Sequence, residues 1–133
     1  MDLDHLVHLQ GDQIAAAAHI YEGDERTSRL VVFDLQTREV LRQWNYGEGF
    51  IKQLEPAGRQ RFASISTDST VRLWDADEGR LLAVFSFDVE PSALAVSPSG
   101  ETLLVGDYNG VIHFLDLVGL GSEPEISDLT IED

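Results

Sequence analysis

The sequence contains no cysteine, which excludes disulfide bonds and thiolate metal sites and fits a reducing compartment. It has no basic residue beyond Arg80: all nine Lys and Arg residues lie between Arg26 and Arg80, and the formal net charge is −15. Nucleic acid is therefore an unfavourable partner, because a phosphate backbone binds to a basic surface. Such acidity either keeps a protein soluble or attracts basic proteins.

Long apolar runs are absent as well. No segment approaches the length of a membrane span, and the start "DLDHLVHLQG" lacks the basic and apolar parts of a secretory signal. We therefore expect a soluble protein that resides in the cytoplasm and does not bind membranes. A length of 133 residues suits one domain, and 43% hydrophobic and 25% charged residues indicate a folded one.

Three stretches of similar chemistry follow one another: "LVVFDL", "VRLWDA" and "IHFLDL". Their aspartates, Asp34, Asp75 and Asp116, are spaced by 41 residues. Apolar residues resume after the polar turns "QTRE" and "DEGR". Chance rarely gives three aligned segments with matching turns, so the pattern predicts a tandem repeat.

Each repeat unit contains four short alternating segments separated by turn residues, which is typical of β-strands. The third unit is the clearest, with "PSALAVS", "TLLVG", "VIHFLDL" and "PEISDLTI". The four alanines of "DQIAAAAHI" favour a helix, but this stretch occupies a second-strand position and we expect a strand. The units predict an all-β domain of three four-stranded antiparallel sheets, at about residues 1–46, 47–88 and 89–133.

The stretch "ASISTDSTVRLWDADEGRLL" resembles the WD-repeat family, whose four-stranded blades recur every ~40–45 residues around a β-propeller. The resemblance covers about residues 11–117. It implies that Trp74 fills the wedge between adjacent blades and that Asp75 accepts backbone N–H bonds in the following turn. The final "GDYNGVIHFLDL" is similar to the last blades of bacterial multidomain signalling ATPases, which suggests a regulatory setting.

The sequence departs from the family pattern in two ways. Family members form a hydrogen-bonded tetrad of His, Ser, Asp and Trp; Ser64, Asp68 and Trp74 match three of these positions, and no His matches the fourth. The tryptophan itself is replaced by Phe33 and Leu115 in the other two units. We expect those units to rely on apolar packing alone.

Three blades do not complete a propeller, which usually closes with about four to eight. The blades at the two ends would expose apolar faces. We therefore expect an incomplete ring that is completed by a second copy or by another chain, or that forms one end of a longer propeller. A compact monomer of three sheets is the alternative.

Motifs for catalysis or metal binding are not apparent. His5 and His8 are three positions apart in an expected strand and would point to opposite faces. His113 lies in the middle of a strand, and "DADEG" lacks the ligands of a calcium loop. Phosphate loops, nucleophile elbows and zinc-binding helices are missing, so we expect no cofactor, no metal and no enzymatic activity.

Loops between strands are the expected binding surface. "YEGDERTSR" is the longest, and Tyr46 and Tyr108 are candidate aromatic anchors. Acidic candidates surround them: Glu48, Asp88, Glu90 and Asp107. The acidic tail "GSEPEISDLTIED" either adds the last outer strand, which its alternation favours, or forms a free recognition segment.

These observations favour a non-enzymatic protein-interaction or assembly module, acting as a scaffold or a regulatory subunit. One alternative is an acidic decoy that blocks a basic nucleic-acid-binding protein. Another is a non-catalytic part of a larger enzyme complex, or catalysis from a ring assembled with a second subunit.

Overall fold

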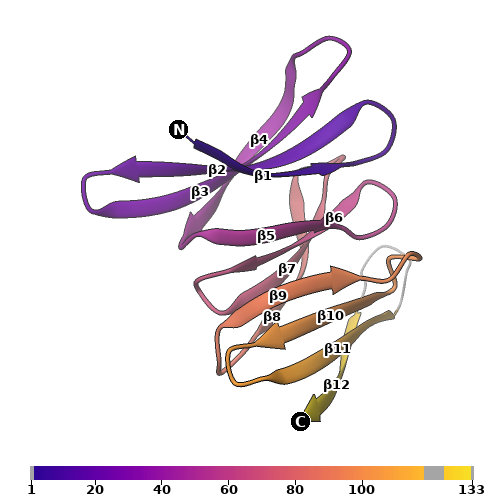
Figure 1. The fold of residues 1–133 in the computed structure, drawn as a ribbon. Coiled ribbons are helices and arrows are strands. Elements are labelled where there is room, and N and C mark those ends of the chain that lie inside the picture. Colours follow the sequence, from indigo (N-terminus) through magenta and orange to yellow (C-terminus); the bar gives the residue numbers. More distant parts are fainter. Residues whose placement is uncertain (1, 119–124, 133) are drawn as a thin grey trace.

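The computed structural model describes residues 2–118 and 125–132, and these form twelve β-strands in three antiparallel sheets (Figure 1). In each sheet, strands adjacent in sequence pair with one another. The first sheet comprises β1 (Asp2–His8), β2 (Gln13–Glu22), β3 (Glu25–Asp34) and β4 (Val40–Glu48). The second comprises β5 (Ile51–Pro56), β6 (Arg61–Ser66), β7 (Thr70–Asp75) and β8 (Arg80–Ser86). The third comprises β9 (Pro91–Val96), β10 (Thr102–Asp107), β11 (Val111–Val118) and β12 (Glu125–Glu132).

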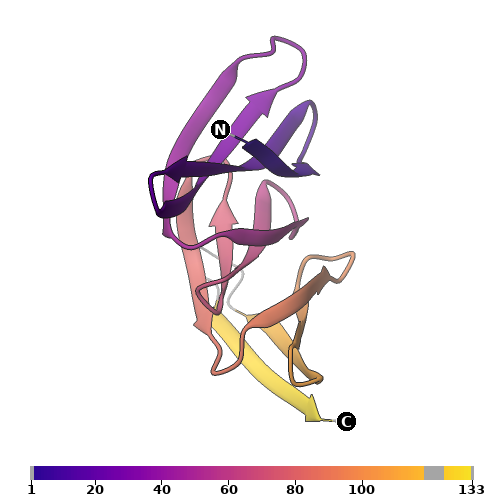
Figure 2. The same cartoon turned by 60° about the vertical axis from the view of Figure 1, so that its left-hand side comes forward.

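The three sheets, called blades 1 to 3 below, follow one another in a row, and the two termini lie at opposite ends of that row (Figure 2). The row does not close on itself, so blades 1 and 3 each have one neighbour. The predicted architecture of three four-stranded blades in an incomplete ring is therefore confirmed. In the described part of the chain, no helix is long and apolar enough to cross a membrane.

The alanine-rich stretch forms β2, as its place in the repeat predicts. Ala15 to Ala18 are all fully buried, which means that both faces of this strand are covered. Tertiary packing of small side chains therefore outweighs the intrinsic helix preference of alanine.

The prediction that "YEGDERTSR" forms a long loop is wrong. Strands β2 and β3 are ten residues each, and cross-strand pairing continues to Glu22 and Glu25, which leaves Gly23 and Asp24 as a tight turn. Gly23 adopts a φ of 61°, which a two-residue hairpin turn requires. The tail, in contrast, supplies the outer strand β12, which pairs with β11 from Glu125 to Glu132.

The repeated aspartates do not all have the same role. The Asp34 carboxylate accepts the backbone N–H of Gln36 at 2.8 Å, and that of Asp75 accepts the N–H of Asp77 at 2.8 Å. Each therefore holds the turn before the outer strand of its blade. Asp116 lies inside β11 and instead accepts the hydroxyl of Thr102 at 2.9 Å.

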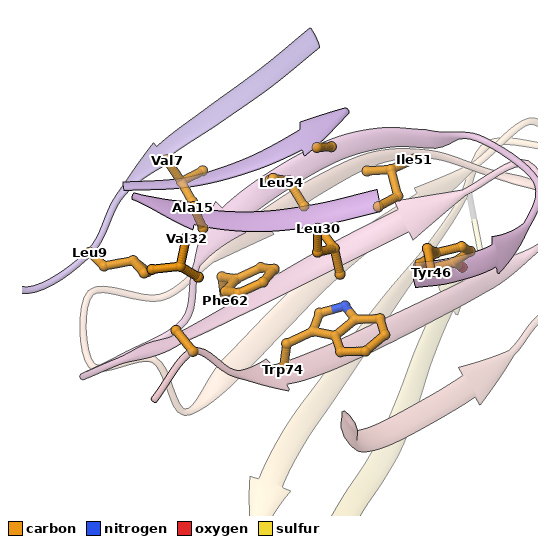
Figure 3. Packing of buried hydrophobic residues seen from close by; sticks show 12 residues of the cluster. Val7, Leu9, Ala15, Leu30, Val32, Tyr46, Ile51, Leu54, Phe62 and Trp74 are labelled. Atoms are coloured by element: carbon orange, nitrogen blue, oxygen red, sulfur yellow. The ribbon is translucent and has the colours of Figure 1, made fainter. Parts of the chain in front are cut away.

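Two apolar cores fill the spaces between neighbouring blades. The core between blades 1 and 2 is built around Leu30, Phe62 and Trp74 (Figure 3). The core between blades 2 and 3 contains Ile65 and Leu103. Blade 2 contributes to both cores because alternate residues of each strand point to opposite faces. The middle blade is thus covered on both sides.

Candidate interaction surfaces

The six proposed contact residues do not form one group. Tyr46 and Asp107 are 6% and 8% exposed. Asp88 and Tyr108 are exposed, and Glu90 is half-buried. Tyr46 and Glu48 were expected in a loop between strands but belong to β4, and the side chain of Glu48 lies outside the described residues. The expectation that Tyr46 and Asp107 are exposed contact residues is therefore corrected below. The contact role of the other residues stays a prediction.

Tyr46 is part of the interior rather than an exposed anchor. Its hydroxyl donates to the carboxylate of Asp68 at 3.0–3.1 Å and shares a 2.9 Å hydrogen bond with the hydroxyl of Thr70. The guanidinium of Arg72 lies 4.4 Å from the centre of the Tyr46 ring. Burial raises the pKa of Tyr46 above its ordinary value. This cluster therefore joins β4 of blade 1 to blade 2.

The tetrad of the family is replaced by two separate sets of hydrogen bonds. The indole N–H of Trp74 donates to the Ser64 hydroxyl at 3.0 Å, while Asp68 is bound by Tyr46 from the preceding blade. The Tyr46 and Trp74 rings are 6.0 Å apart. A tyrosine from a strand thus supplies a polar partner for Asp68 in a blade that lacks the family histidine.

Asp107 holds a turn and a histidine. Its carboxylate accepts the backbone N–H groups of Asn109 and Val111 at 2.8 and 3.1 Å, and it lies 3.1 Å from Nε2 of His113. The hydrogen bond with His113 is the main reason that the pKa of Asp107 lies below its ordinary value. These bonds explain why Asp107 is buried and not available as a surface contact.

Lys52, the only lysine of the sequence, brings two of the proposed residues together. Its ammonium group donates to the Tyr108 hydroxyl and to the carbonyl of Pro91, both at 2.9 Å, and lies 3.7 Å from the carboxylate of Glu90. The Tyr108 side chain remains 63% exposed. Lys52 was not predicted as a site residue, because the sequence separates it from Tyr108 by a whole repeat.

A second polar and aromatic group joins blades 1 and 2. His19 is buried, its ring stacks on Phe50 with centroids 4.3 Å apart, and its nitrogens lie 3.2 Å from the Asp4 carboxylate and 3.1 Å from the carbonyl of Ile51. Burial is the main cause that lowers the pKa of neighbouring His5. Among the residues described here, no three His, Asp or Glu side chains gather to hold a metal ion.

On the face of blade 1 that points away from blade 2, Leu6 of β1 is uncovered, although Ala16 of β2 and Val31 of β3 in the same row are buried. Leu6, Leu54 and Leu94 occupy equivalent positions in the first strands of their blades. Through the second strand of each blade, Leu6 aligns with Val31 on the third strand, Leu54 with Arg72, and Leu94 with His113. These three third-strand residues are spaced by 41 positions, which is the length of the repeat. Leu54 and Leu94 are 4% and 5% exposed, whereas Leu6 is 65% exposed. The difference arises because no blade precedes blade 1 in the described chain.

On blade 3, the face that points away from blade 2 is only partly covered within the described residues. Phe114 lies 41 residues after Leu73 and has the same place in its blade. Leu73 is 1% exposed because blade 3 covers it, while Phe114 and Leu104 are only half-buried. The two ends of the row therefore expose different faces of the same repeating sheet.

Comparison with known proteins gives sequence relatives over parts of the chain, and no family model matches. Human WD repeat-containing protein 36 is 32% identical over 86 residues, which is 62% of this chain and 10% of that protein. The pre-rRNA-processing protein crb3/ipi3 of Schizosaccharomyces pombe is 36% identical over 52 residues, 39% of this chain and 12% of that protein. The WD40 repeat-containing protein HOS15 of Arabidopsis thaliana is 49% identical over 47 residues, 35% of this chain and 8% of that protein. The chain thus spans about a tenth of the length of these relatives.

Solved structures are similar over most of the chain. The β-propeller domain of Cps50 (Swd1) from Myceliophteria thermophila has a TM-score of 0.73 and 18% identity, over 95% of this chain and 38% of that one. The computationally designed Ika8 protein has a TM-score of 0.70 and 20% identity, over 96% of this chain and 36% of that one. At these identities the likeness concerns the fold.

Proposed function

This chain belongs to the WD-repeat β-propeller family, and on this basis we propose that it is a non-enzymatic protein-interaction module, a scaffold or regulatory subunit that binds further propeller blades through its uncovered faces. The observation that carries the proposal is the exposure of Leu6, at 65%, against 4% and 5% for Leu54 and Leu94. The resemblance to bacterial regulators stays a prediction.

The two existing junctions define the chemistry of the missing neighbour. At each one, a large apolar side chain of one blade, such as Phe62 or Leu103, packs against the preceding blade. The preceding blades offer both small and large apolar side chains there, such as Ala15 and Leu30 in blade 1 or Ala63 and Ile65 in blade 2. The occupant that fits blade 1 is therefore a four-stranded blade whose facing strands offer apolar residues. Burial of the apolar face would provide the free energy of association.

The test is the state of association of the purified chain, measured by light scattering from micromolar concentration upward. We expect complexes larger than one chain that persist in high salt, because apolar contacts are not screened. Leu6→Asp should give monomers. Val84→Asp is the matched control, since Val84 is 49% exposed but lies on the middle blade, and it should leave association unchanged.

Two results would overturn the proposal. One is a well-behaved monomer at all concentrations. The other is association that is lost on adding salt and is insensitive to Leu6→Asp, which would instead favour the acidic decoy that binds by charge.

A further inference from the structure

A polar cleft of about 440 Å³ lies between the turns of blades 1 and 2, at the ends of the sheets where β1 leads into β2 and β5 into β6. Five residues line it: Gln10, Gln13, Arg59, Gln60 and Asp77. They come from different turns and strands, and the two uncovered blade faces do not include them. This cleft is separate from the surfaces of the proposed function.

Hydrogen bonds fix the orientation of all three glutamine amides. The backbone N–H of Gln10 can only donate, so the atom of Gln60 that faces it at 3.1 Å is the oxygen. The Gln60 nitrogen then points to the oxygen of Gln13 and to the carboxylate of Asp77, each at 2.8 Å. Arg59 Nε donates to the oxygen of Gln10 at 2.8 Å. The acceptor oxygens of Gln10 and Gln13 are therefore used inside the network.

The same network leaves hydrogen-bond donors unused. Within the described residues, the amide nitrogens of Gln10 and Gln13 and the two terminal nitrogens of Arg59 have no hydrogen-bond partner. Gln10 holds the guanidinium at Nε, which reduces the freedom that a ligand would otherwise have to restrict. The charges of Arg59 and Asp77 offset each other, so what the cleft offers is a surplus of oriented N–H groups.

We propose that this cleft binds a carboxylate group presented by a peptide segment of a partner protein. A carboxylate has only acceptors and matches the two terminal nitrogens of a guanidinium in a bidentate pair. The amide N–H groups of Gln10 and Gln13 can donate to the remaining lone pairs of the carboxylate oxygens or to a peptide carbonyl. The more distant charges of the chain, whose net charge is −15, oppose this binding only weakly, because charges beyond about 8 Å are screened at physiological ionic strength.

The test is an NMR titration of the isotope-labelled full chain with acetyl-Gly-Gly-Asp-Gly-Gly-amide. The side-chain signals of Gln10, Gln13 and Arg59 should shift and saturate. The Asn counterpart of this peptide, which is neutral, should leave them unchanged. Acetyl-tetraglycine with a free terminal carboxylate shows whether the carboxylate comes from a side chain or from a chain end, and binding of either supports the proposal.

Variants separate the cleft from other sites. Arg59→Ala should weaken binding at least about tenfold, because it removes a charge-assisted pair. Arg38→Ala removes an exposed arginine outside the cleft and should not change binding. The variant Leu6→Asp should bind as the native chain does, since the two proposals use different surfaces. Equal shifts with the Asp and Asn peptides, no shifts at all, or full binding by Arg59→Ala would overturn the proposal.

Discussion

Trp44 and Trp74 face each other across the junction of blades 1 and 2, with ring centroids 5.9 Å apart, but their indole N–H groups differ. Nε1 of Trp74 donates to Ser64 at 3.0 Å. Nε1 of Trp44 is buried and has no hydrogen-bond partner among the described residues. Because an unmade hydrogen bond contributes nothing when its donor is removed, the two residues should respond differently to the same substitution.

Trp74→Phe should therefore lower the free energy of unfolding by about 1–3 kcal/mol more than Trp44→Phe. Both changes remove a similar volume, but only Trp74→Phe leaves the hydroxyl of Ser64, which is fully buried, without its donor. Urea denaturation measures both values. Equal losses would show that the Trp74–Ser64 hydrogen bond does not stabilise the fold.

Tyr46→Phe should lower the free energy of unfolding by about 1–3 kcal/mol, because the Asp68 carboxylate and the buried Thr70 hydroxyl both lose a hydrogen-bond partner. Burial raises the pKa of Tyr46, so an absorbance titration of the native chain should contain one tyrosine that ionises at higher pH than an exposed tyrosine does. Tyr46→Phe should abolish that late ionisation. Tyr108→Phe, at a side chain that is 63% exposed, should change stability by no more than about 0.5 kcal/mol. A reversed order of the two would contradict the interior role of Tyr46.

Gly100→Ala should destabilise the junction of blades 2 and 3. A Cβ at this position would lie 2.6 Å from the backbone nitrogen of Gly58 and 2.7 Å from the carbonyl carbon of Ala57, and the backbone cannot move aside as a side chain would. We expect a loss of about 1–3 kcal/mol from overpacking, added to the strain of a φ of 77°. Gly110→Ala has a similar φ of 80° with no atom within 4 Å, so the difference between the two variants isolates the close approach.

Asp107→Asn should flatten the decline of stability in acid. The carboxyl has a lower pKa in the folded chain than its ordinary value of 3.8, so its contribution is complete above that value and is lost as the pH falls through the folded pKa. Urea midpoints across the acid range measure this effect. His113→Phe should cause a change of the same sign, because the His113 hydrogen bond is the largest cause of the shift. An acid decline parallel to that of the native chain would contradict the assignment.

The repeat predicts the fold well because it is read from many residues at once. The spacing of Asp34, Asp75 and Asp116 sets the order of strands, and it correctly outweighs the helix preference of Ala15 to Ala18. Local turn residues were less informative. The polar and charged letters around Gly23 suggest a loop, although antiparallel pairing extends both strands to the tight turn.

The site residues were harder to predict because their partners come from other blades. In the sequence, Tyr46 is an aromatic residue next to a polar segment, which is typical of an exposed loop. Its hydroxyl, however, donates to the carboxylate of Asp68 in the next blade. A signal was available: Phe87 follows Tyr46 by 41 residues, and each ring contacts a side chain of the next blade, Arg72 or His113. The cleft around Gln60 has no such signal, since its residues share no spacing in the sequence.

The exposed Leu6 face and the Phe114 face are different surfaces, so a contact that joins them between copies would run head to tail. Every added copy then presents one new face of each kind. Such growth ends only when the rotation between successive copies returns to the starting point, and otherwise it continues as an open filament. For this chain, the angle between blades would therefore decide whether an assembly is finite, whatever the strength of each contact.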